Sequence, residues 1–157
     1  MAKSILDESN ILAIATRLQR LSERLRQEGS MVYKANGIDF EPKWFPVIYT
    51  LYHKPLLSVV ELATEIGYTH PSTISLLKEL EKEKLICSKK DTHDDRKRLV
   101  ELSEKGAALV KQMQPVWVVI SSAIEALIDT PNNLMKAISE VEEQLQAKTF
   151  LDRTKML

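Results

Sequence analysis

The stretch SVVELATEIGYTHPSTISLLKELEKEKLI, residues 58–86, predicts two short helices joined by a tight turn. Ser58 and Glu61 have the spacing of a capping box, in which a serine hydroxyl and a glutamate carboxylate each satisfy a free backbone amide at a helix start. Gly67 ends this first helix, because glycine adopts the left-handed backbone of a helix C-terminus at least cost. The residues expected to face inward are Leu62, Ala63 and Ile66.

The second helix follows the turn Gly67-Tyr68-Thr69. Thr69 can cap it, and Pro71 falls in its first turn, where a missing backbone amide costs nothing. Ala63 and Gly67 are four residues apart and small, so the two helices can approach closely at the turn. The inward face of the second helix is expected to be Leu76, Leu77 and Leu80.

Two short strands are predicted after these helices, at residues 85–87 and 99–102, with a charged segment between them. Helix, three-residue turn, helix and a hairpin with a basic tip is the winged variant of the helix-turn-helix. An arbitrary helical hairpin is the alternative, and the wing argues against it.

Longer amphipathic segments flank this unit. Residues 8–28 predict a helix, and Gly29 and Gly37 predict a loop after it; Pro42 then suits the first turn of a short helix. Ser103 can cap a long helix with a kink at Pro115, and Thr130-Pro131 is expected to start the last helix. The apolar stripes of these four helices are Ile11, Ile14, Leu18, Leu21 and Leu25; Trp44, Phe45, Ile48, Leu51 and Tyr52; Leu109, Met113, Val116, Ile120, Ile124 and Leu127; and Leu134, Ile138, Val141 and Leu145.

Composition limits the classes of function. The chain has 157 residues, 44% of them hydrophobic, which is enough for one core of ordinary size. Because the formal net charge is zero, any basic surface must be local. No apolar run approaches the roughly 20 residues of a membrane span, and the first residues lack the apolar core of a secretory signal. Cys87 is the only cysteine, which fits a reducing compartment, so we expect a cytoplasmic protein with no membrane partner.

Two segments, VVELATEIGYTHPSTISLLKELEKEKLI (residues 59–86) and DDRKRLVELSEKG (residues 94–106), resemble the multiple antibiotic resistance regulator (MarR) family of bacterial winged-helix transcription factors. The second is similar to the family's Asp-x-Arg hairpin running into a Leu-Thr-x-x-Gly helix start, with Ser103 in the threonine's place. FEPKWFPVIYTL, residues 40–51, looks like the second helix of a subset of that family.

The resemblance implies a fold class and a division into lobes. The expected fold is mainly α with a small β-hairpin wing, a winged helix-turn-helix flanked by long N- and C-terminal dimerisation helices. Residues 1–157 would form a single MarR-like domain, with a DNA-binding lobe at 40–103 and a dimerisation lobe at 1–30 and 104–150. Lys84 stands where the family commonly has a glycine, which predicts a less sharp end to the second helix. Thr73 takes a usually apolar place, which leaves the rotation of that helix open.

The wing segment KKDTHDDRKRLVELSEKG, residues 89–106, has a physical interpretation as a minor-groove probe. An arginine inserted into a narrow, negative groove must be held forward, and Asp94, two residues before Arg96, lies on the same face of an extended strand. Lys89, Lys90, Lys97 and Arg98 would attract phosphate, while Asp91 and Asp95 would reduce non-specific binding. Two alternatives are a merely solvated hairpin and a metal site at Asp91, His93, Asp94 and Asp95, which consecutive residues at a tip rarely form.

Base selection is expected at the start of the second helix, whose N-terminal end would enter the major groove. The proposed readers are Thr69, His70, Ser72 and Ser75, with Ile74 against a thymine methyl group, and the proposed phosphate contacts are Ser58 and Lys78. For His70, Ser72 and Ser75 the alternative is ordinary solvated surface.

The terminal helices carry more apolar stripe than a small winged unit can cover, so we expect a homodimer on a palindromic site. An effector cleft is the further expectation, lined by Trp44, Tyr49, Tyr52, His53, Met113 and Trp117. The resemblance implies repression of transcription, a small aromatic ligand and release of DNA when that ligand binds. Core packing explains the same six residues and is favoured for most of them.

No cofactor is expected, and an enzyme is disfavoured because the three histidines and Cys87 sit in unrelated contexts. A helical protein–protein adaptor that has lost DNA binding is the remaining alternative.

Overall fold

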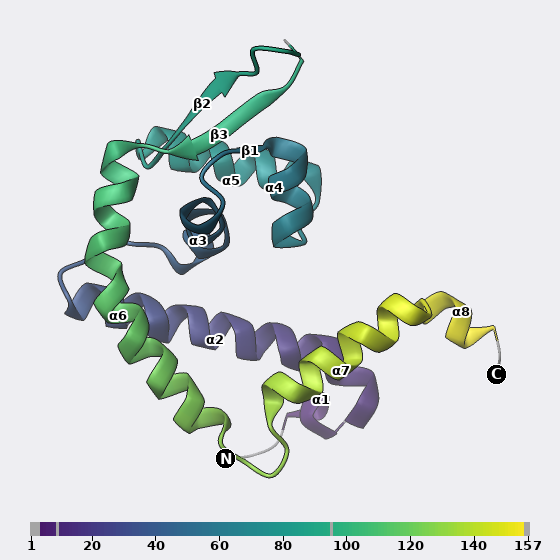
Figure 1. The fold of residues 1–157 in the computed structure, drawn as a ribbon. Helices are drawn as coiled ribbons and strands as arrows, with labels where there is room; N and C mark the ends of the chain where they lie inside the picture. The colour runs from purple at the N-terminus through teal and green to yellow at the C-terminus, as the bar shows by residue number, and fades with distance from the viewer. Residues whose placement is uncertain (1–3, 9, 95, 156–157) are drawn as a thin grey trace. The chain divides into compact units, whose positions relative to one another are not determined.

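The computed structural model describes residues 4–8, 10–94 and 96–155. The chain divides into two compact units, Met1–Val116 and Trp117–Leu157. The first contains α1 (Ile5–Glu8), η1 (Asn10–Ala13), α2 (Ile14–Ala35), η2 (Pro42–Trp44), α3 (Phe45–His53), β1 (Leu57–Ser58), α4 (Val59–Ile66), α5 (His70–Lys82), β2 (Ile86–Lys90), β3 (Arg98–Leu102) and the first half of α6 (Glu104–Ile128) (Figure 1). The second contains the rest of α6, α7 (Leu134–Ala147) and α8 (Phe150–Thr154).

The predicted pair of short helices is confirmed, together with its caps. At the start of α4, the Ser58 N–H donates to Glu61 Oε2 over 2.8 Å and the Glu61 N–H donates to Ser58 Oγ over 3.2 Å. Gly67 ends α4 with φ at 70°. Thr69 Oγ1 then accepts the Ser72 N–H over 3.3 Å at the start of α5. The helix-turn-helix is therefore defined by local hydrogen bonds that the sequence itself specifies.

The sheet has one more strand than the sequence predicts. Its order is β1-β3-β2, with antiparallel neighbours, and β3 pairs Val100 with Ser88 on one side and with Leu57 on the other. β1 is only two residues long, too short to show an alternating pattern, and it leads directly into the Ser58 cap. The β2–β3 hairpin extends beyond α4 and α5 as the wing (Figure 1).

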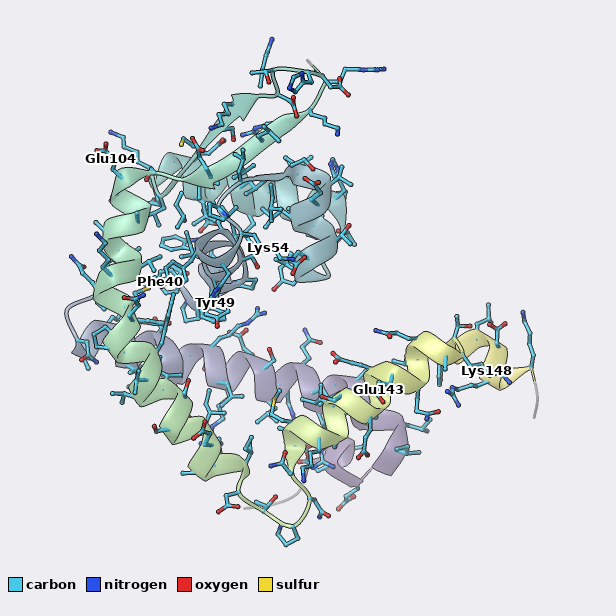
Figure 2. All side chains as sticks on the ribbon, viewed as in Figure 1. Phe40, Tyr49, Lys54, Glu104, Glu143 and Lys148 are labelled. Atoms are coloured by element: carbon cyan, nitrogen blue, oxygen red, sulfur yellow. The ribbon has the colours of Figure 1, made fainter. Side chains whose placement is uncertain are left out.

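The core of the first unit joins α2, α3, α4, α5, the sheet and the start of α6. The Phe40 ring, labelled in Figure 2, packs edge-on against Tyr33 at 4.9 Å and against Trp44 at 5.7 Å between ring centroids. The fully buried residues of this core include Phe40, Val47, Ile48, Leu51, Leu62, Leu77, Leu80, Val100, Val110 and Met113. Several predicted core residues are instead partly exposed, among them Phe45 and Tyr52 on the outer side of α3.

A close backbone contact joins the end of α5 to the start of α6. The Ser103 N–H donates to Leu85 O over 3.1 Å, and the Ser103 hydroxyl donates to Lys84 O over 2.6 Å while accepting the Gly106 N–H over 2.9 Å. A Cβ atom at Gly106 would lie 2.0 Å from Leu85 O, a distance that non-bonded atoms do not adopt. Glycine is therefore required at 106, and the predicted Ser103 cap is confirmed.

Lys84 corrects the expectation of a less sharp end to α5. Its φ is 60°, so the lysine itself adopts the left-handed conformation that glycine commonly supplies. The Leu85 N–H consequently donates to Leu80 O over 3.0 Å, which closes the helix end as a Schellman-type turn does. The buried Leu85 and the Ser103 bond to Lys84 O hold this backbone in place.

Two predicted helix boundaries are wrong. α2 passes through Gly29 and continues to Ala35, because its last turn is anchored by the buried Tyr33; the chain reverses at Gly37, where φ is 69°. The last long helix begins at Leu134, not at Pro131, because Asn133 provides the cap and accepts the Lys136 N–H over 3.1 Å. The short helices α1 and α8 were not predicted, since neither is long enough to show a period.

The long helix α6 runs through Pro115 without a break in helical assignment. Among the described residues it alone is long and apolar enough, by length and composition, to cross a membrane. Its first half uses that apolar character in the core, where Gly106, Val110, Met113 and Val116 are buried. After the unit boundary Val118 and Val119 are exposed.

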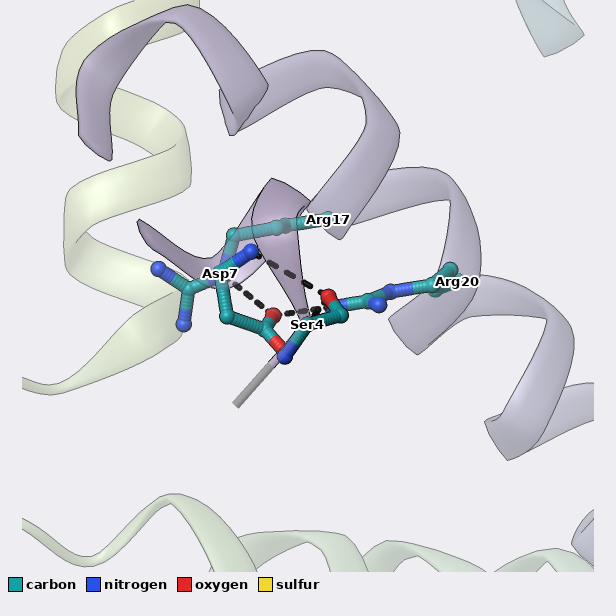
Figure 3. A network of polar contacts seen from close by, with 4 residues as sticks. All are labelled: Ser4, Asp7, Arg17 and Arg20. Atoms are coloured by element: carbon teal, nitrogen blue, oxygen red, sulfur yellow. Dashed lines mark hydrogen bonds and ion pairs between the residues drawn. The ribbon is translucent and has the colours of Figure 1, made fainter. Parts of the chain in front are cut away.

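Polar contacts attach α1 to α2 (Figure 3). Asp7 accepts hydrogen bonds from the Arg20 guanidinium at 2.5 Å and from the Ser4 hydroxyl at 2.9 Å, and Arg17 approaches to 4.0 Å. The hydrogen bond from Arg20, followed by those from Ser4, lowers the pKa of Asp7 from 3.8 to about 2. The short N-terminal helix is thus held against α2 by charge, while Ile5 and Leu6 remain exposed.

We predict that Gly106→Ala destabilises the protein by about 2–3 kcal/mol or more, because the new methyl group forces Leu85 away from α6. Gly29→Ala is the matched control: its Cβ would meet only Pro42 Cγ at 4.0 Å, and α2 should gain about 0.5–1 kcal/mol. Urea unfolding of the three proteins measures both. Equal midpoints for Gly106→Ala and the parent would contradict the close contact.

We also predict that Arg20→Ala returns the pKa of Asp7 from about 2 toward 3.8, measured by NMR titration of the carboxyl carbon. Because the folded pKa lies below the unfolded one, the contribution of Asp7 to stability is present above pH 3.8 and is lost as the pH falls toward 2. Arg24→Ala, which removes an α2 cation paired with Glu28, should leave the Asp7 titration unchanged. An unshifted titration in Arg20→Ala would refute the assignment.

Candidate nucleic-acid interface

The first turns of α5 present a polar outer face. Thr69, His70, Ser72, Ser75 and Lys78 are exposed, and Ile74 is half-buried. Thr73 is completely buried beside Leu77 and Leu80, and its hydroxyl donates to Thr69 O over 3.0 Å. This inward hydrogen bond resolves the rotation of α5, because a threonine can be buried where its hydroxyl finds a backbone acceptor.

The hydroxyl groups at the start of α5 are ordered by one another. The Thr69 hydroxyl donates to Ser72 Oγ over 2.8 Å and accepts the Ser72 N–H. Ser72 Oγ therefore accepts within the protein and keeps its own hydrogen for an outside acceptor. Ser75 lies on the exposed side with His70.

Ser58, predicted as a phosphate contact, lies in a different environment. Its side chain is buried, with 8% of the residue exposed, and its hydroxyl donates to Glu61 Oε2 over 2.6 Å. The hydrogen bonds from Ser58 lower the pKa of Glu61, which keeps the capping carboxylate ionised. The structure thus gives Ser58 a local role in starting α4.

At the tip of the wing, Asp94 and Arg96 are in contact. Asp94 Oδ1 accepts the Arg96 backbone N–H over 3.0 Å and lies 3.5 Å from Arg96 Nε. The side chain of Arg96 is 94% exposed, so the carboxylate holds the base of the residue while the guanidinium faces solvent. The predicted contact is present, but its predicted cause is wrong: Asp94 and Arg96 lie in the turn between β2 and β3, not on an extended strand, and the backbone bond of that turn brings them together.

Hydrogen bonds between residues close in sequence also join Asp91, His93, Asp94 and Lys97 at the tip. Asp91 Oδ1 accepts the His93 N–H over 2.7 Å, and this bond lowers the pKa of Asp91. The Lys97 N–H donates to Asp94 O over 2.8 Å, and the Asp91 N–H donates to Lys97 O over 3.0 Å. Asp91 and Asp94, two of the carboxylates in the alternative metal site, thus each accept a backbone N–H of the turn. Asp95, the third carboxylate of that set, lies outside the described residues.

The cations of the wing separate into two groups. Lys89 pairs with Glu101 at 2.8 Å, which lowers the pKa of that carboxyl group, and Arg98 pairs with Glu81 of α5. Lys90 and Lys97 are exposed, as is Arg96. The positive charge that faces outward on the wing is therefore that of Lys90, Arg96 and Lys97.

Glu81 and Ser88 were missed by sequence reasoning. Glu81 accepts hydrogen bonds from Ser88 on β2 and from Arg98 on β3. A signal was present in the sequence: Glu81 follows Leu77 by four residues and so falls beside the inward face of α5, where a carboxylate requires a partner.

The six predicted effector residues do not share one environment. Trp44 and Met113 are buried, and Trp44 Nε1 donates to Glu79 over 3.0 Å. Tyr49 (labelled in Figure 2), Tyr52 and His53 form an aromatic cluster on the outer side of α3, with His53 4.6 Å from Tyr49 and 4.8 Å from Tyr52 between centroids. Trp117 belongs to the second unit.

Cys87 lies on β2 as predicted and is exposed. Loss of hydration, followed by the negative charge of Glu101, raises the pKa of its thiol. A raised pKa disfavours the reactive thiolate form of Cys87.

Comparison with known proteins agrees with this architecture. A sequence model of the MarR family matches residues 38–97, a range that contains α3, α4, α5 and β2 and ends just before β3. No curated protein matches the chain. Among solved structures, the M. tuberculosis transcriptional regulator MosR in complex with DNA is similar, with a TM-score of 0.72, 18% identity, and coverage of 85% of this chain and 96% of that one.

Two further structures have the same fold. The transcriptional repressor CouR, bound to a 23-mer DNA duplex, has a TM-score of 0.68 and 20% identity, covering 93% of this chain and 99% of CouR. PcaV from Streptomyces coelicolor, in complex with its natural ligand, has a TM-score of 0.65 and 15% identity, covering 94% of this chain and 99% of PcaV. The resemblance is thus supported in two ways: residues 38–97 match the MarR family model, and the chain has the winged-helix fold of these solved structures.

Proposed function

We propose that this protein is a sequence-specific regulator of transcription that binds double-stranded DNA as a homodimer on a palindromic site. The observation that carries the proposal is Arg96, held by Asp94 at the tip of an ordered wing and 94% exposed. An arginine presented in this way suits a narrow minor groove, where the negative potential is strongest.

The outer face of α5 supplies the second half of the interface. His70, Ser72 and Ser75 are the proposed readers of base edges, with Thr69 ordering Ser72 and Ile74 placed for apolar contact with thymine. Lys78, Lys90 and Lys97 are the proposed phosphate contacts, because each has an exposed ammonium group. Lys89 and Arg98 would reach phosphate only by leaving Glu101 and Glu81.

Exposed apolar side chains on both units support the homodimer. In the first unit they are Ile5, Leu6, Ile11, Leu12, Ile14, Leu18 and Leu21; in the second they are Val118, Val119, Ile124, Leu127, Met135, Val141, Leu145, Phe150 and Leu151. Exposed apolar side chains on each unit call for a partner in water, and a second copy also provides a second recognition helix for the other half-site, one duplex turn or about 34 Å away.

Repression, release by a small aromatic ligand and action in the cytoplasm complete the proposal. CouR is described as a repressor bound to DNA, and PcaV was solved with its natural ligand, so both behaviours occur on this fold. The proposed ligand surface is the exposed aromatic cluster Tyr49, Tyr52 and His53 on the outer side of α3.

The proposal predicts that purified protein selects a palindromic sequence from a random duplex library. Affinity for the selected duplex should fall about a thousandfold or more between 50 and 200 mM salt, if six or more phosphates are contacted. Replacing His70 or Ser75 should alter the preferred sequence more than it alters affinity for phosphate. Recovery of no preferred duplex, or binding that ignores salt, would instead favour the protein–protein adaptor.

For the wing we predict that Arg96→Ala weakens binding to the selected duplex by roughly tenfold to a hundredfold, corresponding to about 1–3 kcal/mol for a lost arginine contact. Asp94→Ala should weaken it less, because the guanidinium remains but is no longer held. Lys136→Ala, which removes an exposed cation of α7, is the charge-matched control and should bind like the parent. Mobility-shift titration gives the affinities, and equal binding by Arg96→Ala and the parent would refute the wing assignment.

A further inference from the structure

A single carboxylate connects the recognition helix to both strands of the wing. Oε1 of Glu81, in the last turn of α5, accepts a hydrogen bond from the Ser88 hydroxyl on β2 and another from Arg98 Nη2 on β3. One oxygen atom thus joins the helix to both strands of the hairpin. The side chains are partly shielded from water, with Glu81 28% exposed and Arg98 41% exposed.

The strand register explains why Arg98 points toward α5. Ser88 is paired with Val100, and paired residues of an antiparallel ladder project to the same face. Arg98 precedes Val100 by two residues and shares that face, on which Val100 is fully buried. Lys89 and Glu101 project to the opposite face, where they pair with each other.

The position of this contact along the hairpin matters as much as its partners. Arg98 is paired with Lys90, and this is the final residue pair of the β2–β3 ladder before the tip. Arg96 is only two residues further on. A rotation of the hairpin relative to α5 would therefore be transmitted directly to the guanidinium that is meant to enter the minor groove.

We propose that Glu81, Ser88 and Arg98 form a clamp that fixes the angle between the wing and the recognition helix, so that Arg98 is a positioning residue and not a phosphate contact. The proposal rests on the DNA-binding function proposed above, and it gives Arg98 a different role from the phosphate contact that the sequence suggested. A duplex requires α5 in one groove and Arg96 in the next at a fixed separation, and the clamp is the side-chain link that sets it.

The two roles for Arg98 predict opposite effects of Glu81→Gln. If Arg98 reached phosphate, removal of the neighbouring negative charge would release it and tighten binding. If the clamp holds, the amide makes a weaker contact than the ionised pair, the wing moves more freely, and affinity for the selected duplex falls roughly tenfold.

Glu83→Gln is the matched control for this experiment. Glu83 stands at the end of the same helix, is exposed, and loses the same charge, but its described polar contacts involve the backbone only. We expect its affinity to stay equal to that of the parent or to rise slightly, since an acidic group near DNA has been removed. Tighter or unchanged binding by Glu81→Gln would overturn the clamp.

A double variant tests whether the two residues act as one unit. Glu81→Gln combined with Arg98→Met should weaken binding no more than the worse of the two single changes, because either one already breaks the same contact. If the losses of DNA affinity in the two single variants add in the double variant, or if a gain in one cancels a loss in the other, the two residues act independently and the proposal is contradicted.

Hydrogen exchange tests the clamp without DNA. Backbone amides of β2 and β3 near the tip should exchange several times faster in Glu81→Gln than in the parent or Glu83→Gln, while the amides of α4 keep the parent rates. Faster exchange in a protein that selects no duplex would support the clamp and refute the proposed function. Unchanged exchange with intact DNA binding would refute the clamp alone.

Discussion

The absence of a side chain at Gly106 is the constraint on which the arrangement of the proposed DNA-binding region depends. It lets the first turn of α6 reach the carbonyl of Leu85, while Ser103 bonds to the carbonyl of Lys84 and to the amide of Gly106. The end of the recognition helix, the start of β2 and the end of β3 are thereby fixed within a few bonds of one another. The left-handed backbone at Lys84 is tolerated because these contacts leave it no alternative.

Charge in this region is used mostly to set geometry. The chain carries 22 basic and 22 acidic residues, so strong general attraction to DNA is not available to it. Glu101 holds Lys89, Glu81 holds Arg98, and Asp94 holds the base of Arg96, which leaves few cations facing outward. The proposed DNA interface would therefore gain less from non-specific phosphate contact and depend more on an accurate fit to one duplex.

The features that sequence reasoning predicted are those encoded within a few residues. The Ser58 and Thr69 caps and the left-handed Gly67 follow from local spacing. The contact of Asp94 with Arg96 was also predicted, although a turn and not an extended strand forms it. The errors arise where tertiary contacts decide. Tyr33 extends α2 past Gly29, and Leu85 with Ser103 forces Lys84 into a glycine-like backbone. The two-residue strand β1 exists only because β3 lies beside it. For the candidate site, the outward face of α5 could be predicted from its apolar period, whereas the clamp at Glu81 could not, since it joins three elements.

A hydroxyl-radical footprint on the selected duplex is the most direct test of the central claim, which is that α5 and the wing occupy adjacent grooves under each half of a dimer. The account predicts protected sugars at two minor-groove positions, one on each side of the centre and related by two-fold symmetry. In Arg96→Ala, the protection at these two outer positions should be lost while the remaining footprint persists. A footprint with no symmetry, or outer protections that persist when Arg96 is replaced, would contradict it.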